Sequence, residues 1–201
     1  MDQVLLLATT NPGKIRELKA LLGAVEIPLI EASELSINLE VDEVGSTYYE
    51  NALLKARAYS ETSGKMVLAD DSGLEVDALD GAPGIYSARF SPKANANDAD
   101  RRSYLLKKLA GLPQPWKAHF HCTAVLVTPD GGIHSTEGRC DGIIIPEERG
   151  SGGFGYDPVF YLPEYDATMA ELSPQVKNQI SHRARAVTAM LAILREILAG
   201  E

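Results

Sequence analysis

VLLLATTNPGKIRELKALL, residues 4–22, is the stretch that decides the fold class of this chain. It opens with an apolar run of strand length, which stops at TTNPGK, a segment with the proline and glycine typical of a loop. Apolar residues then recur every three or four positions, as on one face of a helix, at Ile15, Leu18, Leu21 and Leu22. A strand, a loop and a helix in this order are the opening of an α/β unit.

The rest of the chain continues this alternation and predicts a mixed sheet. VEIPLI (residues 25–30) is a candidate strand that Pro28 moves toward a sheet edge. KAHFHCTAVLVTPDGGIHSTEG (residues 117–138) alternates around a PDGG turn and predicts a hairpin. Further helices are expected at residues 48–60, 98–109 and 184–198, and further strands at MVLA (residues 66–69), LEV (74–76) and GIIIP (142–146).

Size and composition indicate one domain of ordinary size, covering residues 1–201 and built from one or two lobes. The net charge of −9, from 28 acidic and 19 basic side chains, disfavours nucleic acid as a partner, although a few focused cations suffice for a small phosphorylated ligand. Two cysteines without C-x-x-C spacing, no signal-peptide pattern and no apolar run of about 18 residues favour the cytoplasm and no membrane.

The loop TTNPGK combines hydroxyls, an amide and a lysine just before a predicted helix. Such a loop suits an anion such as phosphate, because a helix N-terminus presents unpaired N–H groups. It is not a Walker A loop, since Ala8 stands where that motif requires glycine and Ile15 follows the lysine. An ordinary turn with a helix N-cap is the alternative.

Asp70 and Asp71 stand together where the predicted strand MVLA ends. Neighbouring side chains of an extended chain point to opposite faces, so the two aspartates are expected to do different jobs. One can ligate a hard cation such as Mg²⁺ and the other can hold a water or a donor. A solvated Asp-Ser-Gly turn is the alternative. Glu40, Asp42 and Glu43 supply further carboxylates.

Two later segments also carry binding chemistry. GSGGFGYDP (residues 150–158) matches G-x-G-x-x-G, but Pro158 contradicts a dinucleotide fingerprint. Its glycines are expected to let the backbone approach a ligand, with Phe154 or Tyr156 as a surface for a ring, and a flexible loop is the alternative. KNQISHRAR (residues 177–185) offers donors for a phosphate or a carbonyl oxygen, or else forms a polar helix face.

Histidines supply one rival site. His119 and His121 share a strand face and His134 lies across the predicted hairpin, so the three could bind zinc. Strand histidines more often form ordinary hydrogen bonds within a partly buried face.

Taken together, these segments resemble the inosine triphosphate pyrophosphatase family. The likeness rests on T-x-N-x-x-K at residues 9–14, ADDSGLEVDALDGAPGIYSARF at 69–90, GGFGYDP at 152–158 and SHRARA at 181–186. It implies an elongated mixed β-sheet flanked by helices, with two lobes and a central cleft, and a homodimer. It further implies Mg²⁺-dependent hydrolysis of ITP, dITP and XTP to the monophosphate and pyrophosphate, which cleanses the nucleotide pool.

The resemblance also implies roles for individual residues. Asp71 would be the proton acceptor and a metal carboxylate, with Asp70 in support, and Glu43 the second metal carboxylate, with Asp42 as the alternative. The triphosphate would be held by Thr9, Thr10, Asn11, Pro12, Gly13 and Lys14, with Ser72 and Lys177. The nucleoside pocket would be formed by Phe154, Gly155, Tyr156, Asp157, His182 and Arg183.

Base selection has a physical basis in that pocket. Hypoxanthine and xanthine present an acceptor oxygen at position 6, where adenine presents an amino donor. Donors from Arg183 or from backbone amides would satisfy the first and oppose the second. Rival functions are a phosphatase that releases single phosphates, a nucleotide-binding regulator without turnover, and a zinc hydrolase on His119 and His121.

Overall fold

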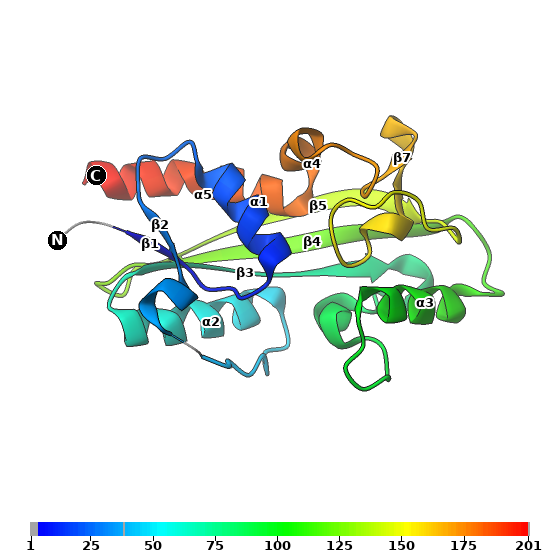
Figure 1. The fold of residues 1–201 in the computed structure, drawn as a ribbon, viewed down its shortest axis with the longest axis horizontal. Helices are drawn as coiled ribbons and strands as arrows, with labels where there is room; N and C mark the ends of the chain where they lie inside the picture. The colour runs from blue at the N-terminus through cyan, green and yellow to red at the C-terminus, as the bar shows by residue number, and fades with distance from the viewer. Residues whose placement is uncertain (1–3, 38, 201) are drawn as a thin grey trace. The chain divides into compact units, whose positions relative to one another are not determined.

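The computed structural model describes residues 4–37 and 39–200, and within these ranges seven strands form one open sheet in the order β2-β1-β3-β4-β5-β6-β7. The strands are β1 (Leu5–Leu7), β2 (Leu29–Glu31), β3 (Met66–Val76), β4 (Trp116–Val127), β5 (Ile133–Ile144), β6 (Phe160–Leu162) and β7 (Ala167–Thr168) (Figure 1). β1 pairs in parallel with β2 and β3, whereas β6 pairs antiparallel with β5 and β7. The expected mixed sheet is therefore confirmed.

Five α-helices accompany these strands in the described part of the chain: α1 (Pro12–Leu22), α2 (Tyr48–Ser63), α3 (Asp98–Leu109), α4 (Pro174–Ile180) and α5 (His182–Ala199). Short 3₁₀ helices lie at η1 (Ala32–Leu35), η2 (Asp77–Leu79), η3 (Gly84–Arg89), η4 (Asp157–Val159) and η5 (Pro163–Tyr165). Across residues 4–37 and 39–200, each helix is too short or too polar to cross a membrane.

Two compact units divide the chain. The first comprises residues 1–71, 122–138 and 182–201, and the second comprises residues 72–121 and 139–181. β3, β4 and β5 each contribute residues to both units. The sequence prediction divided two of these strands wrongly. The strands predicted at 66–69 and 74–76 are one strand of 11 residues, β3. Those predicted at 133–138 and 142–146 belong to one strand of 12 residues, β5.

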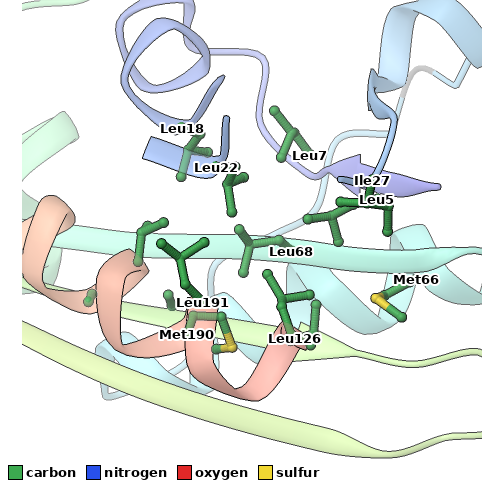
Figure 2. Packing of buried hydrophobic residues seen from close by; sticks show 14 of the residues in the cluster. Leu5, Leu7, Leu18, Leu22, Ile27, Met66, Leu68, Leu126, Met190 and Leu191 are labelled. Carbon is green, nitrogen blue, oxygen red and sulfur yellow. The ribbon is translucent and has the colours of Figure 1, made fainter. Parts of the chain in front are cut away.

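In the first unit, both faces of the sheet are covered. Leu5 and Leu7 point to the face covered by α1 and α5, where they share one apolar cluster with Leu18 and Met190 (Figure 2). Leu6 and Ala8 point to the opposite face, which α2 covers with Ala52, Ala56 and Tyr59. A leucine side chain removed fully from water stabilises a fold by roughly 1.5–3 kcal/mol. Because successive side chains of β1 point to opposite faces, this burial stabilises the packing of helices on both faces of the sheet.

The second unit has its own core. Leu105 and Leu109 of α3 pack with Trp116 and Phe120 of β4 and with Phe160 of β6. The rings of Phe120 and Phe160 lie with their centroids 4.5 Å apart.

End signals explain where α1 and α3 begin. The start of α3 at Asp98 is as predicted, whereas α1 begins at Pro12, inside the expected TTNPGK loop and before the predicted start at Ile15. Asn11 caps α1 and Pro12 opens it, because proline has no N–H group to leave unpaired. Asn97 and Asp100 form a reciprocal capping box at the start of α3. Asp98 in the first turn of α3 accepts the Gly155 N–H at 2.7 Å, so the start of this helix contacts the glycine-rich segment.

Candidate active site

A pocket of about 330 Å³ opens in the first unit and gathers two segments that the sequence presents separately. It is lined by the loop before α1, by the acidic loop before α2 and by α2 itself, at Ala8, Thr9, Thr10, Asn11, Lys14, Leu39, Glu40, Val41, Glu43, Lys55 and Tyr59. The predicted phosphate loop and the predicted metal carboxylate Glu43 therefore line one space.

The phosphate loop is held in shape by its own side chains. The Asn11 Oδ1 atom accepts the N–H groups of Gly13 at 2.8 Å and Lys14 at 3.2 Å. The Thr9 hydroxyl accepts the Asn11 N–H at 3.2 Å. Asn11 is thus an N-cap, as the simpler interpretation expects, and the cap places the positive end of the α1 dipole at the pocket.

A buried chain of charges runs beneath Lys14. Its ammonium lies 3.0 Å from the Asp70 Oδ2 atom, which also accepts the Arg183 guanidinium at 3.0 and 3.1 Å. Arg183 in turn donates to the Glu17 carboxylate at 2.5 Å. Burial opposes ionisation of Asp70, but Lys14 and Arg183 outweigh it and hold the pKa of that carboxyl well below its usual range.

Asp70 therefore has a structural explanation, and two expectations are wrong: the alternative of a solvated turn, and the placement of the aspartates at the end of a strand. The pair lies inside β3 rather than at its end, and Asp70 is 1% exposed. Arg183 opens α5 together with His182, and both side chains are buried. The structure gives Arg183 the role of charge partner to Asp70, while its contact with a base stays a prediction.

The pKa of Asp71 is shifted in the opposite direction from that of Asp70. The amide of Asn51 donates to the Asp71 Oδ2 atom at 3.3 Å, and the Lys55 ammonium lies 3.6 Å from the Asp71 Oδ1 atom. Lys55 also contacts the Glu43 Oε1 atom at 2.6 Å, so two carboxylates share one lysine. Burial raises the pKa of Asp71, and Lys55 only partly offsets this. A carboxylate with a raised pKa is the better proton acceptor.

Lys55 and Asn51 are functional candidates that the sequence interpretation missed. Burial opposes the charge of the Lys55 ammonium, but the attraction of Asp71, Asp70 and Glu43 outweighs it and raises the pKa of Lys55. Asn51 is fully buried on α2. The available signal was their i, i+4 spacing, which places two polar side chains on one helix face beside an acidic loop.

Glu43 and Asp71 are oxygen ligands of the kind that a hard divalent cation takes. Among the side chains that the structure describes, no group of three or more His, Cys, Asp or Glu is arranged to hold a metal. His119 instead contacts Glu75, with 3.0 Å between Nε2 and Oε2, which counts against the zinc alternative. Mg²⁺ is commonly bound through one or two carboxylates together with substrate phosphates, and Glu43 with Asp71 supplies that number.

In the second unit, the glycine loop (residues 150–157) is fixed by hydrogen bonds. The Asp157 Oδ2 atom accepts the Phe154 N–H at 2.9 Å and the Lys177 ammonium at 2.5 Å. That ammonium also lies 5.0 Å from the centroid of the Phe154 ring. A side chain at Gly153 would overlap the Asp157 carboxylate, so this glycine permits an approach by the chain itself, whereas the sequence suggested an approach by a ligand.

Tyr156 is less available than the sequence suggests. Its side chain belongs to the core of the second unit, and its hydroxyl donates to the Ser87 carbonyl oxygen at 2.8 Å. Burial raises the pKa of Tyr156. Phe154 is more exposed, which makes its ring the better candidate to contact a base. Ser72, the residue after Asp71 in β3, is the first residue of this unit.

The sequence and the fold of this chain match those of known proteins. The sequence model of the Ham1 family matches residues 5–193. The chain belongs to the Ham1 family. A Ham1 relative from Desulforamulus reducens, described as a dITP/XTP pyrophosphatase, is 47% identical over 96% of both chains. One from Geobacillus kaustophilus with the same description is 46% identical over 98% of this chain and 97% of the relative.

A solved Ham1 structure agrees with the fold. The HAM1 protein from Coxiella burnetii superposes with a TM-score of 0.87 at 41% identity, covering 96% of this chain and 99% of that one. The resemblance read from the sequence motifs is therefore confirmed at the level of family and fold.

Proposed function

We propose that this chain hydrolyses ITP, dITP and XTP to the nucleoside monophosphate and pyrophosphate with Mg²⁺, and thereby removes deaminated purines from the nucleotide pool. The observation that carries this proposal is the first unit's pocket, where a helix N-terminus and two lysines meet carboxylates. Donors of this kind suit a polyanion, and the descriptions of the relatives as dITP/XTP pyrophosphatases support the substrate class.

The phosphate end of the substrate would be bound by groups that are already ordered. Thr9 and Thr10 offer hydroxyl groups, the positive end of the α1 dipole faces the pocket, and Lys14 offers an ammonium held in place by Asp70. Preorganised donors of this kind stabilise charge without reorganising during the reaction. Pro12 and Gly13 keep the backbone close to the pocket as part of the first turn.

Asp71 would accept the proton of the attacking water. Its carboxylate is oriented by the Asn51 amide, and burial raises its pKa toward the range useful to a base. Bound Mg²⁺, held by Asp71 and Glu43, would offset the charge that builds on the phosphate oxygens. Lys55 stands between the two carboxylates and would balance their charge before the substrate binds.

The base would be read by the second unit's glycine loop and its neighbours. Phe154 offers a partly exposed ring face, and Gly155 and Tyr156 follow it in the same loop. Asp157 fixes Phe154 and Lys177, and His182 with Arg183 begins the last helix. Ser72 and Lys177 would supply further donors in the second unit. We further propose that residues 1–201 act as one functional domain and that the protein is a cytoplasmic homodimer.

The decisive experiment measures products rather than loss of substrate. Purified protein is incubated with Mg²⁺ and each of ITP, dITP, XTP, ATP and GTP, and pyrophosphate and phosphate are quantified separately. We expect pyrophosphate from the first three, far faster than from ATP or GTP. Release of single phosphates would identify a phosphatase, and tight binding of ITP without turnover would identify a regulator.

The role of Asp71 is tested by Asp71→Asn. Removal of a general base typically lowers turnover by about 10²–10⁴-fold, and we expect a loss in this range with folding intact. Asp141→Asn is the matched control, because Asp141 is an exposed aspartate paired with Arg139 on β5. Near-normal turnover in Asp71→Asn would remove this residue from the mechanism.

A further inference from the structure

Both backbone polar groups of Gly155, in the middle of the glycine loop, are held by side chains of α3. The Gly155 N–H donates to the Asp98 Oδ2 atom at 2.7 Å. The Gly155 carbonyl oxygen accepts from the Arg102 Nη1 atom at 2.8 Å. Asp98 and Arg102 are four residues apart, one helical turn, so α3 presents an acceptor and a donor to a single residue.

These two side chains, here called the α3 clamp, are themselves braced. Arg101 pairs with the Asp98 carboxylate and also donates to the carbonyl oxygens of Ala96 and Ala88, at 2.6 and 3.1 Å. The Arg102 Nη2 atom pairs with Glu148 at 2.8 Å. Each member of the clamp thus has a charged partner of its own, Arg101 for Asp98 and Glu148 for Arg102.

Gly155 needs this external support more than another residue would. Its φ is +62°, and glycine enters this region about as readily as the opposite one, so its own backbone does not select the conformation. A Cβ at Gly155 would meet open space, so packing does not select it either. The turn is closed by the Asp157 N–H, which donates to the Phe154 carbonyl oxygen at 3.2 Å, and the charge-assisted bonds from Asp98 and Arg102 add direct support at Gly155 itself.

The residues on both sides of Gly155 are the ones expected to meet the base. Phe154 precedes it with a partly exposed ring, and Tyr156 follows it with a hydroxyl bonded to Ser87. A rotation at Gly155 would turn the Phe154 carbonyl and re-aim the Phe154 ring. The conformation of Gly155 therefore sets the geometry of the surface that selects the base.

We propose that Asp98 and Arg102 are positioning residues for base selection, which act through Gly155 without touching the substrate. This inference rests on the proposed function. Neither residue belongs to the motifs by which the sequence resembles its family. Their part would be to fix one loop conformation before the nucleotide arrives, which lowers the ordering cost of binding.

The first test separates base selection from phosphate chemistry. For Asp98→Ala and Arg102→Lys, kcat and KM are measured with ITP and ATP. Losing one charge-assisted hydrogen bond predicts a fall of about tenfold in the preference for ITP over ATP, carried mainly by a higher KM for ITP. Asp98→Asn keeps an acceptor for the Gly155 N–H and should recover part of the preference.

The matched control is Asp100→Ala. Asp100 lies in the same first turn of α3 and caps it, but it bonds to Asn97 and Lys93 rather than to the glycine loop. This variant destabilises the helix start without removing a clamp contact. An equal loss of preference in Asp98→Ala and Asp100→Ala would overturn the proposal, and so would a preference within twofold of wild type in both clamp variants.

A second test does not depend on turnover. Hydrogen exchange at the Gly155 amide is measured on the ligand-free protein by NMR, and we expect faster exchange in Asp98→Ala and Arg102→Lys than in Asp100→Ala. Unchanged exchange would refute the clamp even if ITP is the substrate. If the wild type fails to hydrolyse ITP while the exchange result holds, the proposed function fails and the clamp stands as a device that orders the loop.

Discussion

Substituting Asp70 by asparagine is expected to cost stability in proportion to the charges that it leaves behind. The Asp70 carboxylate accepts the Lys14 ammonium and two nitrogens of Arg183, whose side chain is 1% exposed. Removing one partner of a buried ion pair costs about 3–5 kcal/mol. Glu17 still pairs with Arg183 at 2.5 Å and Lys14 is partly exposed, so we expect the lower end, about 3 kcal/mol.

The assay is a thermal unfolding curve, with Asp71→Asn as an internal comparison. For a chain of this length, 3 kcal/mol corresponds to a fall in Tm of about 6–12 °C. Asp71 carries the same substitution one residue away, yet burial raises its pKa, so its ionised form weakens the fold at neutral pH. We therefore expect Asp71→Asn to keep or slightly raise Tm.

Thiol labelling gives a second readout near the substituted site. The Cys122 sulfur lies 3.9 Å from the Asp70 Oδ2 atom, and burial raises its pKa to about 12, so it is protonated and slow to react at neutral pH. Labelling of Cys122 should accelerate in Asp70→Asn, more than labelling of Cys140, which is buried in the second unit. A Tm for Asp70→Asn within 2 °C of wild type would refute the reasoning about buried charge (about 1 kcal/mol at most).

Two further predictions concern Asp98 and Lys55. Burial opposes ionisation of Asp98, but the bonds from Gly155 and Arg101 outweigh it and lower the pKa of this carboxyl. The ionised Asp98 should therefore stabilise the fold fully above about pH 4, the pKa of an unfolded aspartate. This stabilisation should vanish as the pH falls through the lowered pKa of the folded state. Melting wild type and Asp98→Asn from pH 8 down to pH 2 checks this, and a Tm difference that does not shrink as the pH falls below about 4 would contradict it. Lys55→Met should lower kcat/KM for ITP at least about tenfold, because Lys55 lines the phosphate pocket. The control Lys107→Met should not, because Lys107 is exposed and lies outside that pocket. Equal effects of the two variants in a pyrophosphate-release assay would speak against the role of Lys55.

The parts of the fold that could be predicted from sequence are those with local causes. The α3 bounds, residues 98–109, follow from a capping box and a helical repeat that lie within the segment. β2 lies at the edge of the sheet, as Pro28 suggested, because a residue without an N–H group disrupts pairing on a central strand. In both cases neighbouring residues contain the whole signal.

β3 shows why local signals fail where tertiary contacts decide. Asp-Asp-Ser-Gly is turn chemistry on its own, yet the strand continues through it to Val76. The ion pair of Asp70 with Arg183 joins residues 113 positions apart, and Lys14 pairs from a third segment. Such partners leave no pattern in the residues around Asp70, so the sequence could identify the carboxylates and could not say which one is neutralised.

The candidate site illustrates the same limit and also suggests a better signal. The motif residues predicted from sequence are mostly those that would touch the substrate, whereas the residues missed are those that hold them. Asn51 and Lys55 hold Asp71, and Asp98 and Arg102 hold Gly155, each pair spaced four apart on one helix. A polar pair at i, i+4 on a helix can bring two groups to one target, because such residues share a face. Polar pairs at this spacing on a predicted helix, especially with one member on the apolar face, are therefore a sequence signal for positioning residues. Both pairs carry this signal.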